Sequence, residues 1–418
     1  MENYTFPDDA LSDLRKEGYE ADLNFETEPY GLYSGDLDLR LNPEAYHVDK
    51  TIPVDDPSHP NDSEVVYAIS TSSGVKGTLV DVQEVDPGHP LPPSSGQIRA
   101  ENDPRIFAQV RDFLKALNSG TGKPIEELSP VDARKVLTDA QASVTVDYSG
   151  IEESEMVIDE EGEHVKIHIT KPVDCKSGAP VFIFIHGGGW VLGDYPTHRR
   201  LVRDLVTESG AVAVFPDYMP SPEAHYPVAI NQIYAVTKWV SGHGDEIGVN
   251  GKSLAVVGNS VGGNMTAAVV LMAKAKGGPD IKLQVMLWPV TDANFGTASY
   301  DDLGEGRFLT KKMMIWFWDQ YLPDGDKRRE IYASPLQATL EQLKGLPPAL
   351  IQTAENDVLR DEGEAYARKL DEAGVSVTLT RYGGLIHDYG LLNPLANIPA
   401  VRTALLQAAA SIRKALSY

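Results

Sequence analysis

The sequence predicts an α/β fold in which a mostly parallel sheet is covered by helices. Six short apolar runs lack polar alternation, which is typical of strands buried on both faces. Most intervals between the runs carry helical spacing, so strands and helices alternate as in a doubly wound sheet. The six runs are 181–185, 211–215, 254–257, 284–288, 349–353 and 375–380.

Composition excludes several classes of protein. The chain has 418 residues, of which 42% are hydrophobic and 23% charged, as in an ordinary globular protein with a sizeable core. Its one cysteine, Cys175, cannot form an intrachain disulfide, so a reducing compartment is permitted. The formal net charge of −24 should repel phosphate backbones and anionic membranes.

The motifs that would indicate other partners are missing from the sequence. It contains no Lys/Arg stripe, P-loop or zinc-type Cys/His spacing, so we expect no nucleic acid, no metal and no organic cofactor. Its first residues lack a basic segment followed by an apolar one, and no apolar run approaches the roughly 18 residues of a membrane span. We therefore expect a leaderless, cytoplasmic protein without a membrane span.

The acidic charge is concentrated in residues 1–100. This segment holds 20 Asp or Glu residues, 6 Lys or Arg residues and ten prolines, so only short regular structure is expected there. Two strand-like stretches, 65–69 and 77–82, flank a Ser/Gly turn and could pair as a hairpin. We predict an acidic N-terminal extension of unknown role, folded on the main body and not a disordered tail.

Two helices are expected before the sheet. Ile106, Phe107, Val110, Phe113, Leu114 and Leu117 have helical spacing and would form one apolar face. A second helix should begin at Ser129, with proline at its first position and an acid three residues after the serine. Residues 155–159 and 165–170, joined by an acidic turn, then predict a hairpin.

The strongest chemical signal is Gly258-Asn259-Ser260-Val261-Gly262. It lies between a predicted strand and a predicted helix, where a tight turn projects the serine hydroxyl above the sheet edge. Glycines on either side let strand and helix pass closely. Alone, such a motif is weak, because Gly and Ser are common in ordinary loops.

A second motif supports the first. His186-Gly187-Gly188-Gly189-Trp190 directly follows the strand 181–185. Acyl transfer develops negative charge on a carbonyl oxygen, and glycine N–H groups are donors unobstructed by side chains. A flexible turn or a simple anion-binding nest would be the alternative if no serine elbow were present.

A nucleophilic serine needs a histidine base and a carboxylate that orients it. Asp357 follows the strand 349–353, and His387 follows the last strand, giving the chain order Ser, Asp, His. Asp361 and Asp388 are alternative acids, although Asp361 is better placed to order the helix 362–371. We favour Ser260, Asp357 and His387.

These residues resemble the hormone-sensitive-lipase-like branch of the α/β-hydrolase fold, which includes the bacterial family IV carboxylesterases. The resemblance runs from about residue 104 to the C-terminus. Besides the motifs above it includes Tyr218, Pro222-Glu223 and Tyr226-Pro227, Trp288-Pro289-Val290-Thr291-Asp292, Ala333-Ser334-Pro335-Leu336 and Asp357-Val358-Leu359-Arg360-Asp361-Glu362-Gly363.

The resemblance implies a role for each site residue. Ser260 would be the nucleophile, His387 the base and Asp357 the acid, with oxyanion donors from the N–H groups of Gly187, Gly188 and Val261. His186, Gly189, Asn259 and Glu223 would support the site, Glu223 as a structural acid outside the triad. The sequence departs from the family pattern at Asn259 and Val261, where Asp and Ala are common, and at Asp388, where Gly is frequent.

The resemblance also implies the domain plan. Residues 101–150 would form a helical cap segment, and 151–418 the α/β-hydrolase catalytic domain with a cap insertion at about 293–330. In that insertion, the aromatic helix 310–321 would cover the site and bring one or two aromatics to the substrate. Nothing in the family motifs accounts for residues 1–100, which we expect to pack over the cap or to mediate self-association, for example as a homodimer.

The expected function is a serine carboxylesterase that hydrolyses short- to medium-chain esters, a small-molecule substrate, through an acyl-enzyme. Two alternatives stay open. The same triad could act on an amide, lactone or carbamate, because fold and triad do not fix the bond. The chain could instead be a ligand-binding pseudoenzyme of the same fold, although His387 is intact.

Overall fold

The computed structural model describes residues 7–27, 30–34, 39–41, 46–54, 62–71, 74–84, 99–120 and 122–417. The chain divides into two compact units, Met1–Ile98 and Arg99–Tyr418. The boundary between the units lies after residue 98, and the acidic segment defined from the sequence ends two residues later, at residue 100. Each unit is described by itself.

The first unit combines one helix with two small sheets. Its four-stranded sheet has the order β1-β7-β6-β5, and its three-stranded sheet the order β2-β3-β4. Ala10 and Leu14 of the helix pack with Val54, Val66 and Ala68 in a small apolar core. The elements are α1 (Pro7–Lys16), β1 (Ala21–Asp22), β2 (Asn24–Thr27), β3 (Tyr30–Ser34), β4 (Leu39–Leu41), β5 (Tyr46–Val54), β6 (Asp62–Thr71) and β7 (Lys76–Glu84).

The hairpin expected at 65–69 and 77–82 is confirmed, since β6 and β7 pair antiparallel with Val66 opposite Val80. The expectation of only short regular structure is wrong, because β5, β6 and β7 have nine or ten residues each. Pro53 is compatible with β5 although proline has no N–H to donate. In the described sheet β5 is an edge strand, and the backbone groups on one side of an edge strand need no partner strand. The proline-rich stretch 90–96 lies outside the described residues.

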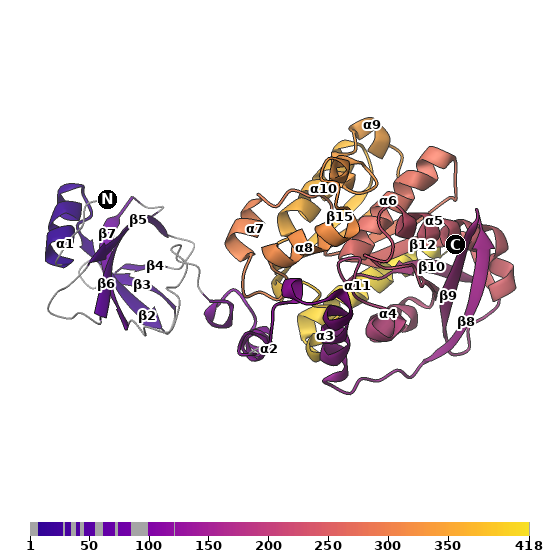
Figure 1. Ribbon diagram of the computed structural model, residues 1–418, viewed down its shortest axis with the longest axis horizontal. Coiled ribbons are helices and arrows are strands. Elements are labelled where there is room, and N and C mark those ends of the chain that lie inside the picture. Colours follow the sequence, from indigo (N-terminus) through magenta and orange to yellow (C-terminus); the bar gives the residue numbers. More distant parts are fainter. Residues whose placement is uncertain are drawn as a thin grey trace. The chain divides into compact units, whose positions relative to one another are not determined.

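The second unit is built on an eight-stranded sheet with the order β15-β14-β13-β12-β10-β11-β9-β8. Strands β10 to β15 are parallel, and only the hairpin β8–β9 runs antiparallel to its neighbours (Figure 1). The strands are β8 (Ile151–Glu160), β9 (Glu163–Pro172), β10 (Ala179–Ile185), β11 (Val212–Pro216), β12 (Val249–Asn259), β13 (Leu283–Leu287), β14 (Ala349–Asn356) and β15 (Val377–Ile386). This is the predicted doubly wound sheet with its predicted edge hairpin.

Both faces of the sheet are buried, as the apolar runs predicted. Along β10, Val181, Ile183 and Ile185 belong to one core, while Phe182 and Phe184 belong to another. Successive side chains on a strand point to opposite faces, so an unbroken apolar run supplies both cores.

Helices α5 and α6 contribute to the first core, and α4 and α11 to the second (Figure 1). No helix among the described residues is long and apolar enough to cross a membrane. The helices of this unit are α2 (Ala108–Asn118), α3 (Pro130–Ala142), α4 (Tyr195–Ser209), α5 (Val228–His243), α6 (Val261–Lys276), α7 (Ala298–Leu303), α8 (Lys311–Tyr321), α9 (Leu340–Leu343), α10 (Arg360–Glu372) and α11 (Pro399–Leu416).

The two helices before the sheet form where the sequence placed them. In α3, Ser129 is the N-cap and its hydroxyl accepts from the Asp132 N–H at 3.1 Å. In α2, Val110 and Leu114 are buried, but Phe107 and Leu117 are each 44% exposed, so the apolar face is narrower than predicted. Phe107 lies before the helix, where its ring covers the backbone at Gly384.

Candidate active site

Ser260 lies on the turn between β12 and α6, at the carboxyl end of the parallel sheet. Its φ of 53° and ψ of −121° are strained for a residue with a side chain, as expected of a nucleophile elbow. Gly262 is required there, because a Cβ at this position would lie 2.0 Å from the Ile185 carbonyl oxygen. The turn therefore forms only with glycine two residues after the serine.

The structure brings Ser260, His387 and Asp357 together. The Nε2 atom of His387 lies 2.9 Å from Ser260 Oγ, and its Nδ1 lies 2.7 Å from Asp357 Oδ2. The other carboxylate oxygen, Asp357 Oδ1, accepts from the Leu359 N–H at 3.0 Å. This is the geometry in which a histidine can take a serine proton while a carboxylate fixes its tautomer.

The surroundings of His387 favour its protonated form. Burial alone would lower the pKa of His387, but the Asp357 and Asp388 carboxylates outweigh it and leave the pKa raised. His387, Asp357 and Asp388 are each at least 90% buried, so little water weakens these interactions. An imidazolium formed during a reaction would be stabilised at this position.

The glycine loop agrees with the sequence prediction only in part. The expectation that Gly187 supplies an oxyanion donor is wrong, because its N–H already donates to Asn259 Oδ1 at 3.0 Å. In the described chain, the N–H groups of Gly188, Gly189 and Val261 have no protein acceptor. Gly189, expected only as a supporting residue, therefore joins Gly188 and Val261 as a candidate donor.

Gly189 also brings the aromatic helix α8 onto the site. A Cβ at Gly189 would lie 2.1 Å from the Phe317 ring, so this side chain rests directly on the glycine loop. Trp190, the next residue, stacks on Tyr321 with ring centroids 4.2 Å apart. Phe317 of α8 thus contacts one of the candidate donor residues, Gly189.

His186 supports the glycine loop through a hydrogen-bond contact and is not a second base. Its ring stacks on Tyr218 at 4.2 Å, and Nδ1 lies 2.8 Å from the Gly187 carbonyl oxygen. Burial lowers the pKa of His186 to about 4, so the ring is neutral at pH 7 and donates Nδ1–H to that oxygen.

Glu223 lies outside the triad and pairs with Arg134 of α3 at 2.6 and 2.8 Å. The same guanidinium donates to the Val191 carbonyl at 2.8 Å and to the Ser221 carbonyl at 3.0 Å. Arg134 thus fastens α3 to the end of the glycine loop. The sequence offered no signal for Arg134, since its partners lie more than fifty residues away.

The two alternative acids have other partners. Asp361 lies in the first turn of α10 and accepts from the Ser299 N–H at 2.8 Å, so it also connects the start of α7 to this helix. Asp388 accepts from Trp288 Nε1 at 2.7 Å and from Asn259 Nδ2 at 3.2 Å, and its Oδ2 lies 3.9 Å from His387 Nε2. Asp357 is the carboxylate in hydrogen-bond contact with Nδ1 of His387.

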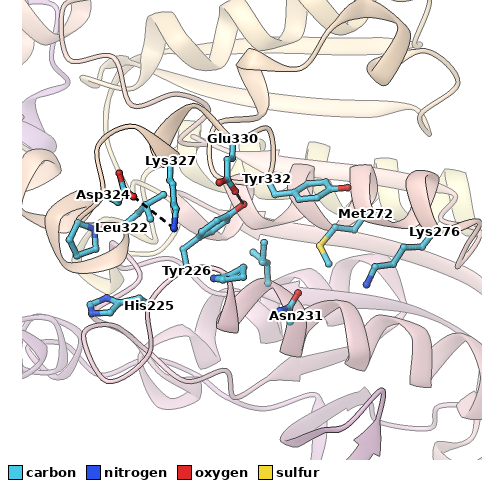
Figure 2. Close-up of a pocket in the computed structure, with 13 residues that line it drawn as sticks. His225, Tyr226, Asn231, Met272, Lys276, Leu322, Asp324, Lys327, Glu330 and Tyr332 are labelled. Carbon is cyan, nitrogen blue, oxygen red and sulfur yellow. Dashed lines mark hydrogen bonds and ion pairs between the residues drawn. The ribbon is translucent and has the colours of Figure 1, made fainter.

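A separate groove of about 570 Å³ lies along α5, α6 and the segment after α8 (Figure 2). Figure 2 shows Tyr226 beside Glu330, to which its hydroxyl donates at 2.9 Å, and Lys327 near Asp324 at 3.8 Å. The residues that line this groove include no member of the triad or the glycine loop. Across the described residues, no group of three His, Cys, Asp or Glu side chains could hold a metal ion.

Comparisons with known proteins agree with this geometry. Residues 182–391 match the model of a family described as having the alpha/beta hydrolase fold. The structure is similar to that of a thermostable esterase from Pseudomonas putida ECU1011, with 61% identity, a TM-score of 0.75, and coverage of 76% of this chain and 99% of that one.

Two further relatives are more distant. Carboxylesterase NlhH of Mycobacterium tuberculosis is 33% identical over 253 residues, which are 60% of this chain and 79% of that protein. A solved esterase from Rhizomucor miehei is 37% identical, with a TM-score of 0.69 and coverage of 72% of this chain and 95% of that chain.

Proposed function

The chain belongs to the α/β-hydrolase family, in its hormone-sensitive-lipase-like branch, and we propose that it hydrolyses carboxylic esters through an acyl-enzyme on Ser260. It is a serine carboxylesterase. The observation that carries the mechanism is the unbroken line of contacts from Ser260 Oγ through the His387 ring to Asp357, at 2.9 and 2.7 Å.

In the proposed mechanism, His387 Nε2 takes the Ser260 proton as Oγ attacks the ester carbonyl. The N–H groups of Gly188, Gly189 and Val261 bind the developing oxyanion, because no acceptor among the described residues occupies them. Asp357 holds the imidazolium, which then protonates the leaving alcohol. A water activated by His387 releases the acid and restores the serine.

We propose short- to medium-chain acyl groups as the substrate class. Two observations support this proposal: the nucleophile is only 3% exposed, and Phe317 lies on the glycine loop. The sequence supports this choice, because it predicts no exposed amphipathic lid helix with a wide apolar face. A cytoplasmic location and self-association through the acidic extension remain predictions from the sequence.

The test replaces Ser260 with Ala and measures hydrolysis of p-nitrophenyl acetate and butyrate. We expect turnover to disappear, together with labelling by an organophosphate. Ser253→Ala is the matched control, since Ser253 is also buried on β12 but its hydroxyl donates to the Leu416 carbonyl. An active Ser260→Ala protein, or an unlabelled wild type, would refute the proposal.

A further inference from the structure

The side chain of Asn259 connects three segments of the site. It is fully buried at the end of β12, next to Ser260. Its Oδ1 accepts from the Gly187 N–H at 3.0 Å, and its Nδ2 donates to Asp388 Oδ1 at 3.2 Å. The glycine loop, the elbow and the loop of the base are thus joined through one amide.

The direction of this amide is fixed by its neighbours. The backbone N–H of Gly187 can only donate, so the oxygen of Asn259 must face it. The nitrogen then faces Asp388 and lies 3.5 Å from His198 Nε2. Burial lowers the pKa of His198 well below its ordinary value, and its Nδ1 lies 3.2 Å from the Asp194 carbonyl oxygen, so Nε2 is an acceptor.

Position 259 therefore needs a donor and an acceptor on one short side chain. An aspartate at position 259 would place its second oxygen next to the Asp388 carboxylate and the unprotonated Nε2 of His198. Two buried carboxylates at about 3 Å cannot both be ionised without a large cost. Asn259 and Asp388 are also two of the positions at which this sequence departs from its family pattern, and the structure places them in contact.

We propose that Asn259 and Asp388 are a matched pair of positioning residues that sets the glycine loop and the base relative to Ser260. The proposal rests on the proposed esterase function. Asp388 directly follows His387, and Asn259 directly precedes Ser260, so a shift of either side chain moves a reacting group. Misplacement by about 1 Å can cost on the order of 100-fold in rate.

A double-mutant cycle with Asn259→Asp and Asp388→Gly tests the pair. Glycine is tolerated at 388, where φ is +56°. We expect Asn259→Asp to lower kcat about 100-fold in the wild-type background. In the Asp388→Gly background, where the opposing carboxylate is gone, the same change should cost no more than about twofold.

Asn264→Asp is the matched control. Asn264 is also fully buried and close to the elbow, on α6, but its Nδ2 donates to the Ala333 carbonyl at 2.9 Å. Its cost should be the same in both backgrounds. An equal cost of Asn259→Asp in both backgrounds, or no cost in either, would overturn the proposal.

Thermal unfolding gives a second reading that does not depend on activity. The Tm of Asn259→Asp should rise when Asp388→Gly is added, and the Tm of Asn264→Asp should not. If Asn259→Asp is not recovered folded, a folded double variant supports the pair and an unfolded one refutes it. An inactive wild type would refute the esterase function and leave this coupling measurable.

Discussion

Arg134 and Glu223 form a two-bond ion pair, with distances of 2.8 and 2.6 Å between guanidinium and carboxylate. The pair itself is weakly stabilising, because Glu223 is half exposed. The hydrogen bond from Arg134 to the Val191 carbonyl should matter more for the position of the glycine loop. The Val191 N–H donates to the carbonyl of Gly188, one of the candidate oxyanion donors.

We therefore expect Arg134→Gln to lower kcat and to reduce the free energy of unfolding by about 1–3 kcal/mol, because two carbonyls lose a charged donor. Glu223→Gln should cost less, since Arg134 keeps both carbonyl contacts. Ester hydrolysis and urea unfolding check this. Equal effects of the two substitutions would contradict the ranking.

The pH dependence of activity should report His387. The base must be neutral, and burial lowers its pKa but Asp357 and Asp388 raise it more, so kcat/KM should fall as pH drops through a pKa above 6.5. Asp388→Asn removes one charge while its amide oxygen can still accept from Trp288. We expect the acid limb of the profile to move to lower pH; an unmoved limb would show that Asp388 does not act on the base.

Stability should decline in acid because of His186. Burial lowers its pKa to about 4, so between pH 6.5 and 4 the unfolded state binds a proton that the folded state does not. The free energy of unfolding should therefore fall by about 3 kcal/mol over that range from this group alone. His186→Phe should lose less on acidification, although it is less stable at pH 7.

Tryptophan fluorescence during urea unfolding at several pH values is the measurement. All five tryptophans of the chain lie in the Arg99–Tyr418 unit, so the signal reports that unit. An equal acid loss in wild type and His186→Phe would rule out this residue as the source.

Gly189→Ala should remove most activity. Its φ is +63°, a region that costs an L-residue about 1–2 kcal/mol, and the new Cβ would overlap the Phe317 ring. Adding Phe317→Ala should restore part of the Tm but not kcat, because the loop strain persists. Full recovery of kcat in the double variant would mean that only the ring contact mattered.

Deleting residues 1–98 tests the acidic extension. The Arg99–Tyr418 unit contains both large cores and should fold alone. We expect the deletion to change oligomeric state or acyl-chain preference, measured by light scattering and an ester series from acetyl to palmitoyl. An unchanged protein would show that the extension only adds charge.

The strands, the helices and the order of the chemical motifs were predictable from the sequence because they depend on local rules. An unbroken apolar run predicts a strand buried on both faces, and β10 shows this directly. The elbow at 258–262 needs only glycine, serine and its place between strand and helix. The sequence patterns do not predict helix α1, and the proline content predicts shorter strands in the first unit than the structure has.

Which N–H groups of the glycine loop are free could not be predicted locally. The family resemblance implies Gly187 and Gly188 as donors, but the Gly187 N–H donates to Asn259, seventy-two residues away. Likewise, Arg134 reaches the loop from a helix that precedes the sheet. Such contacts depend on which distant side chains fold into hydrogen-bond range.

The sequence alone therefore determined the class of the fold, its catalytic chemistry and the order of its reacting residues, because backbone preferences and motif chemistry are local properties. The tertiary structure decided which donors face the substrate, that Asn259 meets Asp388, and that Phe317 covers the loop. Those facts depend on direction and distance, which are set only when strands far apart in sequence align at one edge of the sheet.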